Sequence, residues 1–173
     1  MRIRLLLISL AVFALLPALA GGRSERAVTW SQWERGKSDV RKGVFTVGDS
    51  QCAYTSMADP KVMGKVLPHL EDVLVHADDG VFQDVTLVER FFPVGTVESR
   101  YHRSIDGTAR LEWKLIKGRQ AKHDGFWQVH PSGKVEFENA IEAKSILHRA
   151  LLRSIQVRAM EGVAESIQEH CGK

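Results

Sequence analysis

The stretch SILHRALLRSIQVRAMEGVAESIQE, residues 145–169, decides the fold of this chain. It contains no proline, and Gly162 is its only glycine. Apolar side chains recur in it at the three- and four-residue spacing of one helix face: Ile146, Leu147, Ala150, Leu151, Ile155, Met160, Val163, Ala164 and Ile167. The pattern predicts one long amphipathic helix, and its apolar stripe needs a large apolar surface to lie against.

The residues before this helix alternate with a period of two, which is typical of strands with one buried face. The clearest case is the run in which Ala109, Leu111, Trp113 and Leu115 alternate with Arg110, Glu112 and Lys114. Turn signals at 78–80, 93–95, 106–107 and 131–133, together with a looser link at 117–120, divide residues 73–141 into a predicted six-strand antiparallel meander.

A further strand is predicted at 44–47, ahead of two short helices at 50–57 and 60–66. Asp49 or Ser50 can cap the first helix, and the Asp59-Pro60 pair separates the two. The predicted fold class is therefore α+β: a curved seven-strand antiparallel sheet that grips the long C-terminal helix, with two short helices after the first strand.

Two tryptophans precede the first predicted strand. Thr29 is expected to cap a short helical turn that carries Trp30 and Trp33 and ends at Gly36. We expect these tryptophans to pack on the outside of the domain. A role at a lipid surface is the alternative.

The first twenty residues have the pattern of a secretory signal peptide. Arg2 and Arg4 precede an apolar run from Leu5 to Leu16, and Ala18 and Ala20 supply the small residues that a signal peptidase requires. A membrane anchor is the alternative, but the run is about a dozen residues long, whereas spanning a bilayer takes about twenty. We therefore expect cleavage near Ala20 and a secreted or periplasmic protein.

Removal of residues 1–20 leaves 173 − 20 = 153 residues, enough for one domain with a core of its own. The predicted organisation is an extension at 21–42 followed by a domain at 43–171. Only two arginines leave with the signal peptide, so 22 basic side chains then face 21 acidic ones. Such a balanced charge argues against a nucleic-acid partner. We expect a monomer, and peripheral contact with a membrane stays open.

Two cysteines remain in the mature chain, Cys52 and Cys171. In an oxidising compartment an even pair is more often bridged than free, so we predict a disulfide between them. The alternatives are two separate buried thiols or, less favoured, metal ligands. No cofactor or metal site is predicted, because no metal-ligand spacing, phosphate-binding glycine loop or nucleophile motif is present.

Several short motifs resemble the START-like superfamily of helix-grip proteins, also called SRPBCC, and especially its polyketide cyclase/dehydrase or coenzyme Q-binding branch. They are the stretch from Tyr54 to Pro60, the Leu67-Pro68-His69-Leu70 segment followed by Val73, the strand from Leu111 to Lys117, and Gly125-Phe126-Trp127. The resemblance covers residues 43–170. Asp49-Ser50-Gln51 departs from the usual Ala-Pro start of the first helix, and no polar cluster of a catalytic member is recognisable.

The resemblance implies an internal cavity for a hydrophobic molecule such as a lipid, an isoprenoid quinone, a sterol-like or a polyketide-like compound. Strand parity and helix spacing indicate a compatible lining. The predicted ligand-binding residues are Val97, Ser99, Tyr101, Arg103, Leu111, Trp113, Leu115, Trp127, Phe137, Asn139, Leu147, Leu151 and Ile155, with Ile105, Val129 and Ile141 on the same faces. The alternative is that these side chains simply fill the core.

Three functions fit this sequence, and a binding or carrier protein for a hydrophobic small molecule is preferred. A cyclase, aromatase or dehydratase would need a general acid or base in the cavity, for which Tyr101 and His123 are the candidates. An envelope interaction protein with a vestigial cavity is the third. An ion pair between Arg103 and Glu89 is a further expectation, as an alternative to their contact with a ligand head group. Enzymatic activity is neither required nor excluded by these residues.

Overall fold

The computed structural model describes residues 27–34, 36–90, 95–106 and 108–173. The predicted signal peptide, the start of the predicted extension and most of the 93–95 turn lie outside these residues. In chain order the elements are β1 (Thr29–Glu34), β2 (Asp39–Thr46), α1 (Ser50–Ala58), α2 (Pro60–Val66), β3 (Leu70–Asp78), β4 (Phe82–Glu89), β5 (Thr96–Asp106), β6 (Thr108–Lys117), β7 (Gln120–Val129), β8 (Lys134–Ala143) and α3 (Ile146–Cys171).

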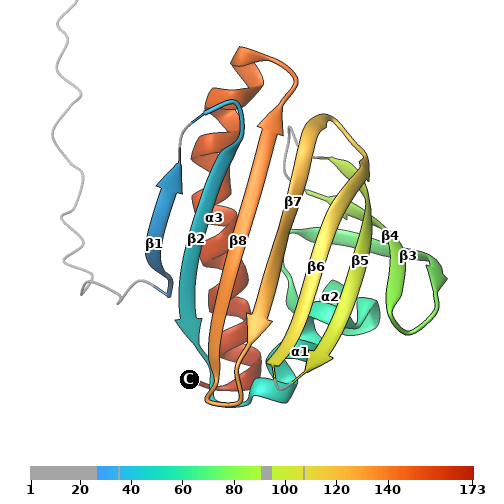
Figure 1. Ribbon diagram of the computed structural model, residues 1–173, viewed down its shortest axis with the longest axis vertical. Coiled ribbons are helices and arrows are strands. Elements are labelled where there is room, and N and C mark those ends of the chain that lie inside the picture. The colour runs from blue at the N-terminus through green and yellow to red at the C-terminus, as the bar shows by residue number, and fades with distance from the viewer. Residues whose placement is uncertain (1–26, 35, 91–94, 107) are drawn as a thin grey trace, which may run out of the picture.

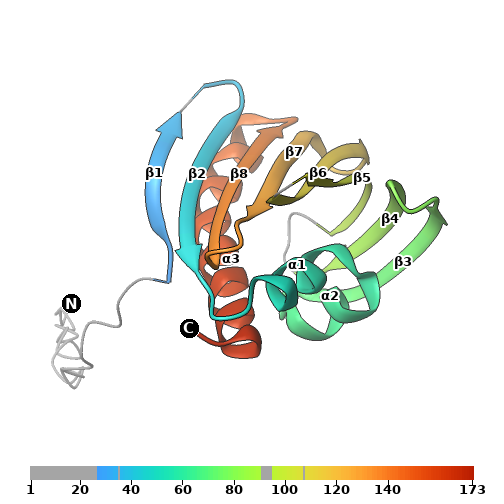
Figure 2. The ribbon, with the colours of Figure 1, turned by 60° about the horizontal axis from the view of Figure 1, so that its bottom comes forward.

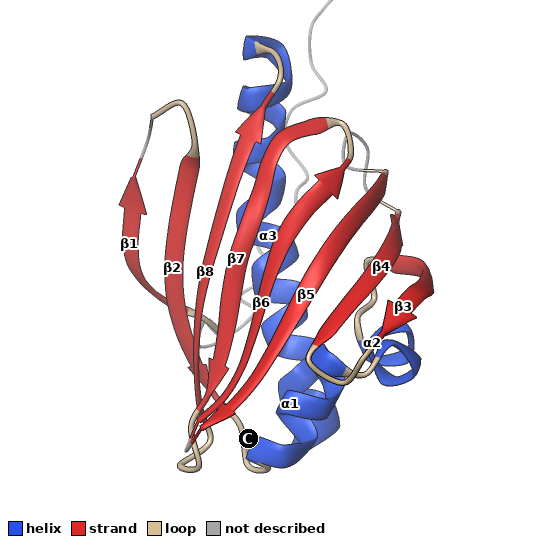
Figure 3. Ribbon diagram, turned by 45° about the vertical axis from the view of Figure 1, so that its right-hand side comes forward, coloured by secondary structure: helices blue, strands red, loops and turns tan. Residues whose placement is uncertain are grey.

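The strands form one antiparallel sheet in the order β1-β2-β8-β7-β6-β5-β4-β3 (Figure 1). The sheet curves, and α3 lies along its concave side, with α1 and α2 near the C-terminal end of α3 (Figure 3). In Figure 2, α1 and α2 lie between that end of α3 and the β3–β4 hairpin. The predicted α+β fold with a gripped C-terminal helix is therefore confirmed. Among the described helices, none has both the length and the apolar character needed to cross a bilayer.

The strand count differs from the prediction, because the segment predicted as a helical turn is strand β1. It pairs with β2 from Thr29 opposite Val44 onward, and a bulge between Trp30 and Gln32 shifts the register. Because of this bulge, Trp30 and Trp33 both contact the guanidinium of Arg41, although residues three apart on a regular strand would face opposite sides. Two side chains three residues apart would also share one face of a helix. The sheet thus has eight strands and begins inside the predicted extension.

The two short helices match their predicted positions, and each begins at an aspartate. The side chain of Asp49 accepts a hydrogen bond from the backbone N–H of Cys52 at 2.9 Å. The side chain of Asp59 does the same for Lys61 at 2.8 Å, and Pro60 occupies the first turn of α2. Because Asp59 ends α1 and starts α2, the chain turns sharply there.

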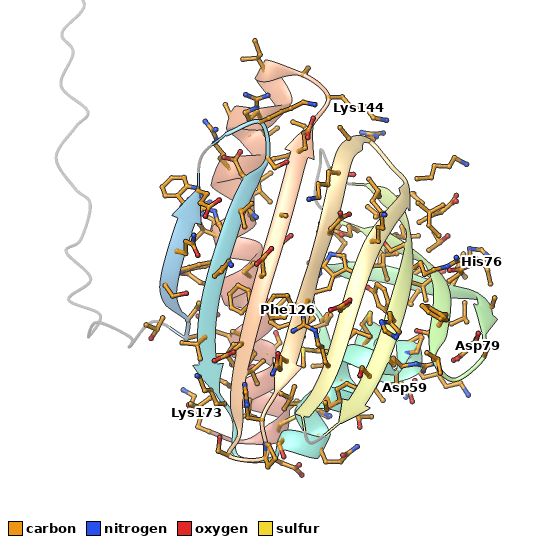
Figure 4. The ribbon with its side chains drawn as sticks, viewed as in Figure 1. Asp59, His76, Asp79, Phe126, Lys144 and Lys173 are labelled. Carbon is orange, nitrogen blue, oxygen red and sulfur yellow. A yellow bond between two sulfur atoms is a disulfide. The ribbon has the colours of Figure 1, made fainter. Side chains whose placement is uncertain are left out.

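The C-terminal end of α3 is tied to α1 and to the loop before it. A disulfide joins Cys52 to Cys171, across a sequence separation of 119 residues. The backbone N–H groups of Gly48 and Asp49 donate to the carbonyls of Gly172 and Cys171 at 2.9 and 3.1 Å. Figure 4 labels Lys144 and Lys173, which flank α3 and lie at opposite ends of the domain.

Candidate functional site

An internal cavity of about 110 Å³ lies between the concave face of the sheet and α3. Its walls come from all three helices and from strands β3 to β8. The lining residues are Met57, Met63, Leu67, His69, Leu70, Leu87, Glu89, Ser99, Tyr101, Leu111, Trp113, His123, Trp127, Asn139, Ile141, Leu152, Ile155, Gln156, Ala159, Met160 and Val163. Most of these side chains are apolar, so the space suits an apolar molecule.

Aromatic rings form the sheet side of the cavity, and a glycine makes room for one of them. The indoles of Trp113 and Trp127 lie 6.1 Å apart, and Trp127 in turn packs against Phe137 at 5.0 Å between ring centroids. Trp113 is paired with Gly125 on β7. A Cβ at Gly125 would overlap the Trp113 ring and the carbonyl oxygen of Glu138, so only glycine fits beneath this indole. The next residue, Phe126, lies on the opposite face of the sheet, under the guanidinium of Arg110 (Figure 4).

Four titratable side chains line the cavity, and burial shifts the pKa of each toward its uncharged form. Burial raises the pKa of Glu89 to about 7. It also raises the pKa of Tyr101, and the nearby Glu89 adds to that increase. The pKa values of His69 and His123 are lowered to about 4, in both cases chiefly by burial. At neutral pH both imidazoles and the phenol are uncharged, and Glu89 is the one group close to its titration point.

Polar atoms on neighbouring strands face this space without a hydrogen bond of good geometry from the described residues. They are the indole Nε1 of Trp113, Nδ1 of His123 and the amide Oδ1 of Asn139. The amide nitrogen of Asn139 is occupied, because it donates to Sδ of Met160 at 3.4 Å. Gln156 is also engaged, since its amide nitrogen donates to the backbone carbonyl of Asn139 at 3.1 Å. The side chains of His123 and Asn139 also interact with each other, so a ligand or water could bond to the Trp113 indole N–H and to this His123–Asn139 pair.

Seven of the thirteen predicted ligand-binding residues line the cavity: Ser99, Tyr101, Leu111, Trp113, Trp127, Asn139 and Ile155. Ile141, predicted on the same faces, lines it too, and so does His123, the other candidate acid or base. Strand parity was sufficient for the central strands because they are regular and one face of each is buried. Their contact with a ligand stays a prediction.

Five other predicted residues lie elsewhere. Val97 and Leu115 are not in the lining and pack in a small cluster with Ile141, Ala143 and Leu152, of which Ile141 and Leu152 line the cavity. Phe137 is buried in the main core against Trp127. Leu151 is exposed, and its neighbour Leu152 faces the sheet instead. Val129, named only as a neighbour on the same faces, is likewise buried in the main core outside the lining. The side chains of Ile105 and Leu147 lie outside the described part of the chain.

Arg103, the fifth, points away from the cavity, so the expected ion pair with Glu89 is wrong. Its guanidinium pairs with Asp78 at the end of β3. Arg103 instead lines an open surface groove beside Tyr54 and Gln83, between α1 and the β3–β4 hairpin. The alternation of side chains along β5 correctly placed Arg103 on the concave face of the sheet. This face extends beyond the cavity, however, and at Arg103 it is α1 that lies over it.

Sequence reasoning missed the cavity walls contributed by α1, α2 and the strands nearest to them. Met57, Met63 and Leu67 line the cavity from these helices, and His69 and Leu87 from the chain beside them. Asp59-Pro60 predicted the break between the helices but not the angle at which they meet the sheet. Within the described residues, no group of three His, Cys, Asp or Glu side chains is placed to hold a metal ion.

Solved structures of low sequence identity share this architecture. The Zhui aromatase/cyclase from Streptomyces sp. R1128 matches with a TM-score of 0.65 at 11% identity, over 78% of this chain and 93% of that one. A STAR-related lipid transfer protein from Xanthomonas axonopodis matches with a TM-score of 0.59 at 14% identity, over 85% of this chain and 99% of that fragment. The chain has the START-like helix-grip fold.

Human STARD10 also has this helix-grip fold, with a TM-score of 0.58 at 10% identity, over 86% of this chain and 76% of that one. No protein-family profile matches the chain. No curated protein matches it either. At these identities, the likeness to the three solved structures concerns the fold.

Proposed function

We propose that this protein binds a hydrophobic small molecule in the cavity beneath α3 and serves as an exported binding or carrier protein. The observation that carries the proposal is the apolar space between sheet and helix, with polar atoms on one wall that lack a hydrogen bond of good geometry. The names of the structural neighbours are compatible with it, since they describe lipid transfer and an aromatase/cyclase. Export rests on the N-terminal pattern of residues 1–20.

The size of the cavity limits what it holds. An engineered protein cavity of about 150 Å³ takes up benzene, so about 110 Å³ suits a ring-sized group. Sites that enclose drug-sized ligands measure about 300 to 1,000 Å³. A whole lipid, quinone or polyketide would therefore need α3 to move away from the sheet, whereas a small ring compound would not.

A change of the same kind at two positions of α3 tests this proposal. Ala159 lines the cavity, whereas Ala150 is exposed on the same helix. Ala159→Leu should fill the space and abolish ligand binding, and Ala150→Leu should leave binding unchanged. Native mass spectrometry of freshly purified protein, followed by titration with 2-phenylethanol, reports both. Equal binding by the two variants, or no uptake of any apolar probe by the wild type, would contradict the proposal.

A cyclase, aromatase or dehydratase is the second candidate. One observation favours it: Tyr101, His123 and Glu89 line a single cavity, and the pKa of Glu89 is raised to about 7, where a general acid or base works best. Loss of turnover with retained binding in Tyr101→Phe or His123→Gln would distinguish this candidate from a carrier.

A further inference from the structure

Glu89, the last residue of β4, carries a carboxyl group in the cavity wall without a counter-ion. Among the described residues, none forms an ion pair or a side-chain hydrogen bond with it. No lysine or arginine is among the described residues that line the cavity. Arg103, the expected partner, is held by Asp78. A carboxylate without a partner in an apolar wall reduces stability, so its presence suggests that a ligand supplies the missing charge.

The other groups that face Glu89 do not supply this charge either. His69 lies just before β3, Tyr101 on β5 and His123 on β7, and at neutral pH all three are uncharged. From α3, the described side chains that line the cavity are apolar except for the amide of Gln156. Glu89 is therefore the one lining group that titrates between about pH 6 and pH 8.

The unpaired polar atoms are mainly hydrogen-bond acceptors. Oδ1 of Asn139 accepts only. The carboxylate of ionised Glu89, which lines the same cavity, also accepts only. His123 interacts with Asn139 itself, so it adds no free acceptor, and the indole N–H of Trp113 is the one unpaired donor among them. A head group that fits this set has several N–H donors, as an ammonium does.

The walls around these acceptors are aromatic. Trp113 and Trp127 lie 6.1 Å apart, and Tyr101 pairs directly with Trp113 across β5 and β6. Aromatic faces attract organic cations, and the attraction grows when the site is shielded from water. A negative side chain, acceptor atoms and aromatic walls together favour a cation over an anion.

Building on the proposed function, we propose that the ligand is an apolar amine whose ammonium group binds Glu89 while its ring lies against the tryptophans. A fatty acid, a phosphorylated lipid or another anion would face the Glu89 carboxylate with no cation to offset it. The cavity volume restricts the amine to a ring-sized body, such as that of 2-phenylethylamine.

Three probes that differ only in the head group test this inference: 2-phenylethylamine, 2-phenylethanol and phenylacetate. Their affinities are measured by isothermal titration calorimetry at pH 6 and pH 8 on the wild type, on Glu89→Gln and on Glu71→Gln. Glu71 is exposed on β3 and serves as the matched control. Because Glu89 ionises with a pKa of about 7, the wild type should bind the amine about tenfold more tightly at pH 8 than at pH 6.

Glu89→Gln should weaken amine binding at pH 8 by about tenfold or more, remove the pH dependence, and leave binding of the alcohol unchanged. Glu71→Gln should behave as the wild type. If the alcohol binds as tightly as the amine, or if Glu89→Gln binds the amine normally, the amine inference fails and the binding function stands. If none of the three probes binds, the proposed function fails with it.

Discussion

The two halves of α3 contact the rest of the domain in different ways. The C-terminal half is sealed by apolar packing, with Val163, Ala164 and Ile167 at most 4% exposed and Cys171 bridged to α1. In the N-terminal half Ile146 is 83% exposed and Leu151 38%, whereas Leu152 is buried.

Polar contacts to β2 take the place of apolar packing in the N-terminal half. Arg153 pairs with the buried carboxylate of Asp39 at 2.8 Å. Gln156 accepts a hydrogen bond from Arg41 at 3.2 Å. The cavity lies against the middle of the helix, where side chains from Leu152 to Val163 line it. The comparison shows how one helix both completes a core and roofs a cavity: its C-terminal end is packed and cross-linked, and its N-terminal half is held by polar contacts to β2.

Removing the cross-link should have the largest effect. The double variant Cys52→Ser/Cys171→Ser opens a loop defined by a sequence separation of 119 residues, so it should lose about 4 to 5 kcal/mol of unfolding free energy. Urea denaturation followed by circular dichroism measures the loss, and wild-type protein under reducing conditions is the control. A loss below about 1 kcal/mol would mean that packing alone secures the C-terminal half.

A pair of truncations sharpens the contrast between the halves. Ile167→Ala removes a fully buried side chain and should cost about 2 to 5 kcal/mol. Leu151→Ala removes a side chain that is 38% exposed and should cost less than about 1 kcal/mol. Thermal and urea unfolding of both variants give the comparison. Equal losses would show that the N-terminal half is packed as tightly as the C-terminal one.

The last prediction concerns the carboxyl of Glu89 in the cavity wall. The pKa of Glu89 is about 7 in the folded protein and about 4.3 in an unfolded chain, so the folded state holds this proton more tightly. The protonated Glu89 carboxyl therefore stabilises the folded wild type at low pH, and this contribution to the unfolding free energy is lost as the pH rises from about 4.3 to about 7. Glu89→Gln should be more stable than the wild type by up to about 3.5 kcal/mol at pH 8 and equal to it at pH 4.

Urea titrations at pH 4, 6 and 8 measure this difference. The lowered pKa values of His69 and His123 destabilise the folded state as the pH falls below about 6.5, but they do so in both proteins and cancel in the comparison. A difference that does not grow between pH 4 and pH 8 would mean that the Glu89 carboxyl is well hydrated.

Several elements could be predicted because their signals are local. Asp49 and Asp59 cap the two short helices, and alternation along β6 and β8 assigned their inward faces. The β1 strand was missed because a bulge gives Trp30 and Trp33 a spacing that a helix also explains. In the candidate site, parity identified lining residues on the regular strands, and it missed the walls made by α1 and α2.

The C-terminal helix shows both what the local sequence pattern could predict and what it could not. Its existence and amphipathic character follow from residues 145–169, but its buried face includes Gln156 and Leu152 rather than Leu151. Gln156 is polar, so the sequence pattern alone did not place it on the buried face. Its burial is tolerated because Arg41, which is distant in the sequence, donates a hydrogen bond to it.

The sequence by itself determined the caps, the turns, the strand alternation and the long helix, since each depends on residues close together in the chain. The tertiary structure alone decided that Arg103 pairs with Asp78, that Glu89 has no described partner, and that α3 leaves a cavity of about 110 Å³. The physical reason is that volume and charge pairing depend on how distant segments meet, and local periodicity carries no information about those distances.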